Sequence, residues 1–178
     1  MPLKPDPTFY PSPRSAAAAP PEEYAYVVTL NDAGTGAAAP DATGQPRPDA
    51  LTVVDLRQGS PTYGQLVGRL DMPNVGDQLH HFGWNACSSA LCPWAPHPHV
   101  ERRYLVIPGL TSSRIHIVDV KDDPFAPKLV KVIEPDEVHR ATGYSRPHTS
   151  HCGPEGTVRV RLGRARRRRP GRRVPHGP

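Results

Sequence analysis

An internal repeat is the feature that most constrains the fold of this 178-residue chain. The repeated segments are ALTVVDL (50–56) with SPTYGQLVGRLDMP (60–73), and RIHIVDV (114–120) with DPFAPKLVKVIEP (123–135). In each copy an alternating apolar run ends in Val-Asp, passes a proline-containing turn and continues in a second short run around Leu-Val. The equivalent aspartates are 119 − 55 = 64 residues apart. Short alternating runs bounded by turn residues predict β-strands.

A further strand-like segment precedes each copy, EEYAYVVTL (22–30) in the first and ERRYLVIPG (101–109) in the second. A unit of about four strands that recurs along a chain is typical of a propeller blade, and common blades repeat at roughly 40–50 residues. Proline-rich insertions at 31–48 and 90–99 account for the longer spacing here. We therefore predict an all-β fold, a partial β-propeller that comprises about the first two blades of a longer propeller.

Composition sets the expected boundaries. Twenty-four prolines and 15 glycines favour turns over long helices. We expect a disordered lead at 1–21, the blades at 22–158 and an arginine-rich tail at 159–178. No run approaches the roughly 18 apolar residues of a membrane span, and the first residues do not resemble a secretory signal. With three cysteines, an odd number, we expect free thiols, a cytoplasmic location and no membrane partner.

The arginine-rich tail has two interpretations in a chain whose formal net charge is +5. It can bind nucleic acid non-specifically, because arginines neutralise phosphates and release counterions. It can also be the product of a frameshift, because Gly-Asp-Gly codons written GGC-GAC-GGC contain CGA-CGG out of register, which encode Arg-Arg. A third blade is expected to continue at this point, so the frameshift predicts a truncated, aggregation-prone and inactive chain.

Two histidine clusters, LHHFGWNACSS (79–89) and RPHTSHCGPEG (146–156), carry the candidate chemistry. Each is predicted to lie where the outer strand of one blade returns to the inner strand of the next, beside the central channel. Imidazole nitrogens suit copper, zinc, iron and nickel, whereas thiolates favour softer ions such as Cu(I) and zinc. The residues that these clusters predict on one face of the ring are His80, His81, His148 and His151, with Cys87 and Cys152 close behind.

The spacing within each cluster matters, because neighbouring residues of a regular strand point to opposite faces. His80 and His81 can both reach one metal only if a loop or bulge carries them. His148 and His151 meet the same difficulty in a strand, but the Pro-His-Thr-Ser sequence around them fits a turn that brings both inward. Neither spacing matches that of a zinc finger.

Other titratable residues are predicted to be structural or solvated. His116 alternates within RIHIVDV and is expected to pack inside a strand. Asp55 and Asp119 end equivalent strands and are expected to accept backbone hydrogen bonds in the following turns. His139 in EPDEVHRATGY fits either a surface position on a short helical turn or a metal ligand. Solvated loop positions are expected for His97, His99 and His176.

Four strings in order along the chain, DQLHHFGWNACSS, SSRIHIVDV, APKLVKVIEP and HTSHC, resemble the selenium-binding protein family, whose enzymatic members are methanethiol oxidases. The resemblance runs from about Glu22 to Gly156, an N-terminal part of a family member, and the tail departs from it. It implies a β-propeller and a copper-dependent reaction that converts methanethiol, oxygen and water into formaldehyde, hydrogen sulfide and hydrogen peroxide. The implied partners are a small thiol and oxygen, and nothing in the sequence specifies an oligomeric state.

Carried over residue by residue, the resemblance implies four copper ligands and a selenium-binding cysteine. The implied ligands are His80, His81, His148 and His151, and selenium is implied at Cys87. Cys87, His81 and His148 are then expected to act in catalysis.

Neighbouring residues would have to fix the tautomer of each ligating imidazole. The nearest candidates for this role are Thr149, Ser150 and Asp77. Many family members read CSSC where this chain reads CSSA, with Ala90 in the fourth position, which argues against a vicinal dithiol.

Two other functions fit the same residues. The first is a selenium-binding or metal-binding protein without turnover that uses Cys87 as its attachment point, and oxygen-dependent release of sulfide and peroxide would distinguish the enzyme from it. The second is a propeller that only scaffolds protein partners, with histidines that line the channel for structural reasons. Absence of copper from the purified full-length protein would favour this second function.

Overall fold

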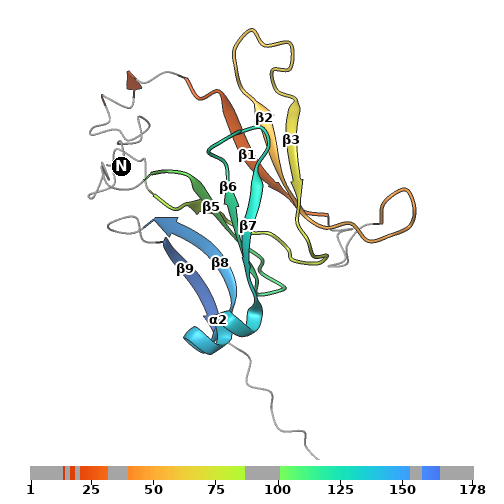
Figure 1. Cartoon of the computed structure of the whole chain (residues 1–178), viewed down its shortest axis with the longest axis vertical. Coiled ribbons are helices and arrows are strands. Elements are labelled where there is room, and N and C mark those ends of the chain that lie inside the picture. The colour runs from red at the N-terminus through yellow and green to blue at the C-terminus, as the bar shows by residue number, and fades with distance from the viewer. Residues whose placement is uncertain are drawn as a thin grey trace, which may run out of the picture.

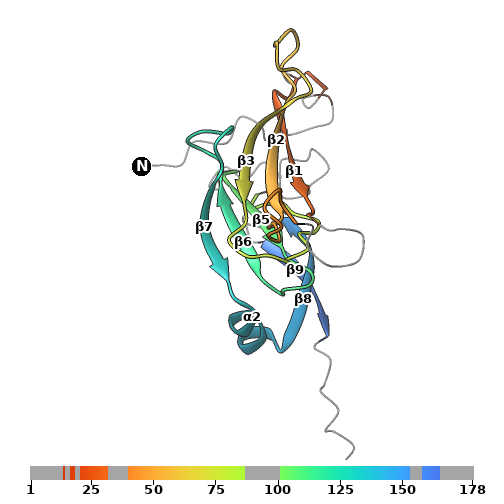
Figure 2. The ribbon, with the colours of Figure 1, turned by 90° about the vertical axis from the view of Figure 1, so that its right-hand side faces the viewer.

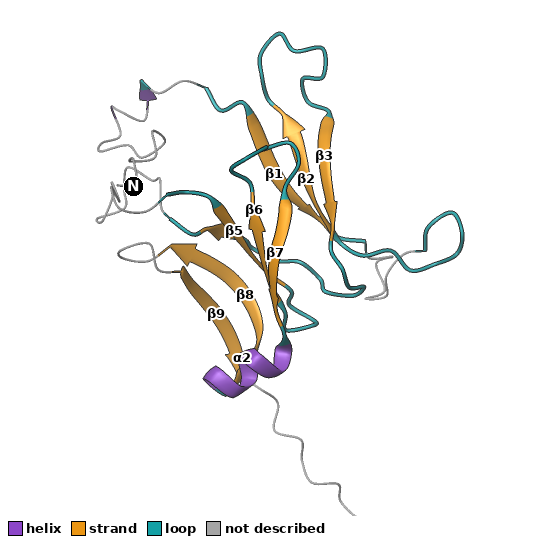
Figure 3. Ribbon diagram, in the orientation of Figure 1, coloured by secondary structure: helices purple, strands orange, loops and turns teal. Residues whose placement is uncertain are grey.

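The structure, a computed structural model, describes residues 21–31, 40–86, 101–152 and 158–164, together with positions 14, 17 and 18. The strands are β1 (Tyr24–Thr29), β2 (Ala50–Asp55), β3 (Leu66–Asp71), β4 (Gly83–Trp84), β5 (Tyr104–Pro108), β6 (Ile115–Asp119), β7 (Lys128–Ile133), β8 (Tyr144–Cys152) and β9 (Val158–Arg164). Helix α2 (Pro135–Thr142) connects β7 to β8 (Figure 3).

The strands form antiparallel sheets in which sequence neighbours are also neighbours in space. Their orders are β1-β2-β3, β4-β5-β6-β7 and β8-β9. The sheets follow one another in chain order (Figure 1), and the view from the side shows the same succession (Figure 2). Sheets of this kind with short connections agree with the predicted all-β, partial propeller. The last sheet includes residues 159–164, which the sequence pattern assigned to the tail.

The repeat recognised in the sequence is a structural repeat. Tyr24 is paired with Asp55 where β1 meets β2, and Tyr104 is paired with Asp119 where β5 meets β6. A register shift follows Val53 in the first sheet and Ile117 in the second, and these positions differ by 117 − 53 = 64 residues. In both sheets the extra residue lies on the strand that follows, Val67 in β3 and Val130 in β7, so a β-bulge occupies the same place in each copy.

The aspartates that end the two middle strands have the predicted structural role. Asp55 Oδ1 accepts the backbone N–H of Arg57 at 2.9 Å, and Asp119 Oδ1 accepts that of Lys121 at 3.0 Å. Asp55 also accepts hydrogen bonds from the side chains of Arg57, Ser60 and Thr62. These bonds hold the pKa of the Asp55 carboxyl well below its usual range.

The larger apolar core joins the first two sheets. Its buried members are Leu51, Met72, Leu79, Leu105, Ile107, Val118 and Val120. Leu51, Leu105 and Ile107 are fully buried, and each such side chain contributes about 1.5–3 kcal/mol to stability. At the rim, the Tyr26 hydroxyl donates a 3.0 Å hydrogen bond to the carbonyl of Pro124. Successive strand residues face opposite sides. Val106, between Leu105 and Ile107 on β5, therefore belongs to a second core.

The second core lies between the middle sheet, α2 and β9. Val106, Ile115 and Val138 are its buried members, and Val160 and Leu162 pack against it. Helix α2 begins with Pro135, whose fixed φ suits the first helical position. It ends at Gly143, where φ is 71° and the N–H bonds the carbonyl of His139. The side chain of His139 is exposed, as expected for a surface position on a short helix.

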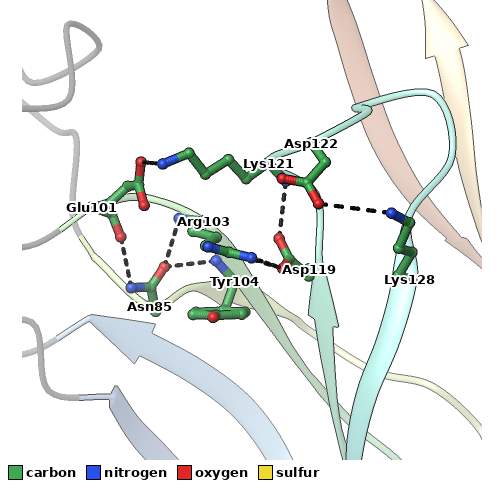
Figure 4. A network of polar contacts seen from close by, with 8 residues as sticks. All are labelled: Asn85, Glu101, Arg103, Tyr104, Asp119, Lys121, Asp122 and Lys128. Atoms are coloured by element: carbon green, nitrogen blue, oxygen red, sulfur yellow. Dashed lines mark hydrogen bonds and ion pairs between the residues drawn. The ribbon is translucent and has the colours of Figure 1, made fainter.

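A polar network lies at one end of the β4-β5-β6-β7 sheet, where β5 begins and β6 ends (Figure 4). Asn85 Oδ1 accepts the backbone N–H groups of Arg103 and Tyr104 at 3.0 and 2.9 Å. The Arg103 guanidinium pairs with Asp119, with its Nε 2.8 Å from Oδ2. Lys121 pairs with Glu101 at the same end. These bonds fix the start of β5 against the end of β6.

Candidate metal centre

The segment that carries His80 and His81 is held between two strands by its backbone. Leu79 forms an isolated antiparallel β-bridge with Gly109, and the His80 N–H donates a hydrogen bond to the carbonyl of Pro108 at 2.8 Å. On the opposite side, the carbonyl of His81 accepts the N–H of Ser150 at 2.9 Å. The two histidines therefore lie between β5 and β8. Along the chain they follow β3, the last strand of the first sheet, and precede β4, the first strand of the second, as predicted.

The backbone of His80 and His81 is irregular, so these neighbouring side chains need not point to opposite faces as they would in a regular strand. Residues 80–82 are not part of a regular strand, and β4 starts only at Gly83. The backbone of β8 approaches so closely there that a Cβ added at Gly83 would lie 2.7 Å from the carbonyl oxygen of Ser150. An irregular segment between Leu79 and Gly83 lets both imidazoles point to the same place, which a regular strand forbids.

Three imidazoles meet at this junction. The ring centroids of His80 and His81 are 4.5 Å apart, those of His80 and His148 are 4.2 Å apart, and those of His81 and His148 are 4.9 Å apart. One ligand nitrogen from each ring lies within 4.8 Å of the others. Two nitrogens bound to one ion at about 2.0–2.1 Å are at most about 4.2 Å apart, so metal binding requires only a small closing movement of the rings.

The surroundings of His80 favour its neutral imidazole. Burial, followed by the nearby His148 and His81, lowers the pKa of His80 below its ordinary value. The Nδ1 atoms of His80 and His81 are 3.2 Å apart and face each other. A neutral imidazole is the form that binds a metal, so this donor set fits copper, zinc, iron or nickel.

His148 enters the group from β8, and His151 does not. Nδ1 of His148 lies 2.7 Å from the Thr149 hydroxyl, which agrees with the expectation that Thr149 orients an imidazole. The expected turn around residues 149–150 is wrong, because both residues belong to β8 (Tyr144–Cys152) and pair with Arg161 and Val160 of β9. His148 is a bulge residue of β8, because the register shifts between Pro147 and Thr149, whereas His151 pairs regularly with Arg159. Its side chain is exposed and lies outside the three-histidine group.

Asp77 is not placed beside the three imidazoles but in a separate buried pair. Its Oδ2 lies 3.2 Å from Nε2 of His116, and both side chains are fully buried. Arg114 donates to Asp77 Oδ1 at 3.1 Å. Burial raises the pKa of Asp77, but its polar contacts with His116, Ser112 and Arg114 outweigh burial and hold the pKa below its usual value. His116 is packed inside its strand as predicted, but its carboxylate partner was not foreseen.

A cavity of about 490 Å³ adjoins the centre on the side of His148. Its other lining residues are Leu110, Arg146, Leu162 and Gly163. The cavity is thus lined by two leucines, an arginine, a glycine and one of the three histidines. No sequence signal marked Leu110 or Leu162 as neighbours of His148, because they come from separate strands and turns.

One predicted site residue, Cys87, and several residues predicted to lie in loops fall outside the part of the chain that the structure describes. Cys87, Ala90, Cys92, His97 and His99 lie outside the described residues, as does His176. Cys152 is the last residue of β8. The predicted role of Cys87 in selenium binding and catalysis therefore stays a prediction.

The fold and the cluster define an all-β protein in which antiparallel sheets bring three imidazoles together as a candidate metal centre. Comparison with known families agrees with the sequence resemblance. The family model of the 56-kDa selenium-binding protein (SBP56) matches residues 3–174, and the chain belongs to this family.

Individual relatives support the same assignment. The chain is 44% identical over 151 residues to selenium-binding protein 2 of Arabidopsis thaliana and 42% identical over 151 residues to methanethiol oxidase of Bos taurus. Each match covers 85% of this chain. The crystal structure of a hypothetical selenium-binding protein from Sulfolobus tokodaii matches 84% of the chain with 55% identity and a TM-score of 0.71.

The chain spans only part of these relatives, 28% of the Arabidopsis protein, 29% of the bovine protein and 30% of the archaeal structure. Among the residues that the structure describes, no helix has the length and apolar character needed to cross a membrane.

Proposed function

We propose that the three-histidine group is part of a copper site at which a small thiol, methanethiol, is oxidised by oxygen. The observation that carries the proposal is the convergence of His80, His81 and His148 within 4.8 Å in a chain whose relatives include proteins named methanethiol oxidase. In the implied reaction, methanethiol, oxygen and water give formaldehyde, hydrogen sulfide and hydrogen peroxide. The C–S bond breaks, water supplies the carbonyl oxygen, and oxygen takes up an electron pair and two protons.

The residues of this chain prepare the site for that chemistry. Copper held by neutral imidazoles would bind the soft thiolate and mediate electron transfer from the thiol to oxygen. His80 stays neutral because of its burial and its histidine neighbours. When Nδ1 of His148 donates its hydrogen to Thr149 Oγ1 at 2.7 Å, Nε2 keeps its lone pair for the metal.

The cavity beside His148 is the proposed thiol-binding site. Leu110 and Leu162 offer apolar contacts to the methyl group, and Arg146 lines the same cavity. A guanidinium near the sulfur favours the thiolate over the thiol, because a positive charge stabilises a neighbouring anion. Cys87 contacts the substrate or carries selenium in this proposal, as the family resemblance implies.

The test separates metal binding from turnover. The chain is titrated with copper, bound metal is measured by elemental analysis, and the Cu(II) EPR spectrum is examined for imidazole nitrogen hyperfine splitting. We expect nitrogen splitting in the chain itself and loss of both signals in His81→Ala. We expect turnover, measured as sulfide, formaldehyde and peroxide in equal amounts, only in a protein of the relatives' full length. Full copper content in His81→Ala would overturn the proposal.

A second candidate is selenium or metal binding without turnover, which the relatives named selenium-binding protein favour. The two functions differ in their products. A full-length protein that binds copper or selenite and releases no sulfide or peroxide from methanethiol under oxygen would support the binding function and contradict the oxidase.

A further inference from the structure

The β5–β6 turn, residues 109–114, touches both histidine segments at once. On one side Leu110 N–H donates to the carbonyl of Gln78 at 3.0 Å, and Thr111 N–H donates to that of Asp77 at 3.2 Å. On the other side the backbone N–H of Arg146 donates to the Ser113 hydroxyl at 2.9 Å. Asp77 and Gln78 shortly precede His80, and Arg146 shortly precedes His148. The turn therefore bonds the residues just before His80 and those just before His148, which are far apart in the sequence.

Unusual backbone conformations are concentrated at these contacts. Among the described residues, positive φ occurs at three non-glycine positions: Gln78 at 52°, Ser113 at 66° and Arg146 at 57°. Positive φ is unfavourable for L-residues with a side chain and persists only where the surroundings impose it. Each of the three residues takes part in a hydrogen bond between the turn and a histidine segment. The fold maintains this geometry against local backbone preference.

Charge reinforces the same contacts. Arg114 Nη1 donates to the buried Asp77 Oδ1 at 3.1 Å, and its Nε donates to Glu134 Oε2 at 3.0 Å. Asp77 is fully buried and also contacts His116. A buried carboxylate that loses a partner is strongly disfavoured, so Arg114 determines where Asp77 and the residues that follow it can lie.

From these contacts we infer that Ser113 and Arg114 are positioning residues of the histidine centre. Arg114 acts through Asp77 on the segment of His80 and His81, and Ser113 acts through Arg146 on the strand of His148. Because the two residues are consecutive, they fix the two segments relative to each other. The metal-binding consequence rests on the proposed function, whereas the effect on imidazole spacing does not.

The test uses the 178-residue chain with Ser113→Gly, Arg114→Gln and the double variant. Glycine adopts positive φ without strain, so Ser113→Gly removes the hydroxyl and leaves the backbone conformation accessible. Arg103→Gln is the matched control, because it removes an Arg–Asp pair from the other end of the same sheet (Figure 4). Thermal melting of every variant separates loss of folding from loss of positioning.

Two readouts are needed. In the metal-free chain, NMR cross-peaks between the rings of His80 and His148 report their 4.2 Å separation. In the presence of Cu(II), competition with a chelator gives the dissociation constant. We expect Ser113→Gly and Arg114→Gln to weaken the ring cross-peaks and to reduce copper affinity about 10–100-fold. Arg103→Gln should leave both readouts unchanged even where its melting temperature falls.

The outcomes distinguish the positioning role from the proposed function. Unchanged ring cross-peaks in folded Ser113→Gly and Arg114→Gln would overturn the inference whether or not copper binds. Weakened cross-peaks in a chain that never binds copper would support the positioning role and contradict the metal site. Equal effects in Arg103→Gln would show general destabilisation and would also overturn the inference.

Discussion

The backbone N–H of Ser150 donates a 2.9 Å hydrogen bond to the carbonyl oxygen of His81. This bond joins the two histidine clusters directly, because Ser150 follows His148 by two residues on β8. The contact is tight, since Gly83 lies against the carbonyl of the same Ser150. The approach of the imidazoles therefore depends on the close packing of β8 against the start of β4.

Gly83→Ala is expected to separate these strands. The added Cβ would lie 2.7 Å from the Ser150 carbonyl oxygen, so the backbone must shift. Forcing extra volume into a packed region costs about 1–3 kcal/mol, measurable as a lower free energy of unfolding in urea. The ring cross-peaks between His81 and His148 should weaken in the same variant. Gly163→Ala is the control, because its nearest contact would be an ordinary 3.5 Å, and an equal loss there would contradict this explanation.

Replacement of single histidines should show that the group of three binds copper and that His151 does not. His148→Ala removes one imidazole of the cluster and should lower copper affinity by at least about tenfold. His151→Ala removes an exposed ring outside the cluster and should change the affinity of this chain by less than about twofold. Equilibrium competition with a chelator measures both. A large loss in His151→Ala would restore His151 as a ligand and show that β8 rearranges on binding.

Acid should destabilise the chain partly through Asp55. Its pKa is lower in the folded chain than in the unfolded chain, because Arg57, Ser60 and Thr62 donate to the carboxylate. A carboxyl with a depressed folded pKa stabilises the fold above its unfolded pKa of about 3.9, and this stabilisation is lost as pH falls toward the folded pKa. Asp55→Asn should therefore be less stable than the parent at pH 7.

The difference in melting temperature between Asp55→Asn and the parent chain should shrink as pH falls below about 4. Asp71→Asn is the control, because that carboxylate is exposed at the protein surface. A difference that stays constant from pH 7 to low pH would show that Asp55 contributes through packing and not through its charge.

Cys87 is expected to be the dominant reactive thiol. A thiolate, not a thiol, reacts with iodoacetamide or selenite, and the family resemblance associates selenium with this cysteine. Cys87→Ser should remove most of the label, quantified by peptide mass spectrometry, and leave the circular dichroism spectrum unchanged. Cys92→Ser serves as the control, and labelling mainly at Cys92 or Cys152 would contradict the assignment of Cys87.

The sequence predicted the strands of the two repeat copies because their pattern is local. Alternating apolar residues in YAYVVT and IHIVD specify extended backbone with two distinct faces. The terminal positions of Asp55 and Asp119 followed from the same pattern, since an aspartate at a strand end caps the next turn. The helix α2 was visible only as a possible short helical turn, because it contributes a single buried residue, Val138.

The sequence by itself determined the family, the antiparallel strands and the candidate ligand types, because these depend on residue identity and short-range periodicity. Tertiary structure decided which histidines meet. His81 and His148 approach through a hydrogen bond between distant segments, and the irregular backbone at 80–82 places adjacent imidazoles together. His151 lies outside the group, paired regularly with Arg159 of β9, whereas His148 is a bulge residue of the same strand. The pairing of Asp77 with His116 likewise depends on packing between segments, which no local pattern specifies.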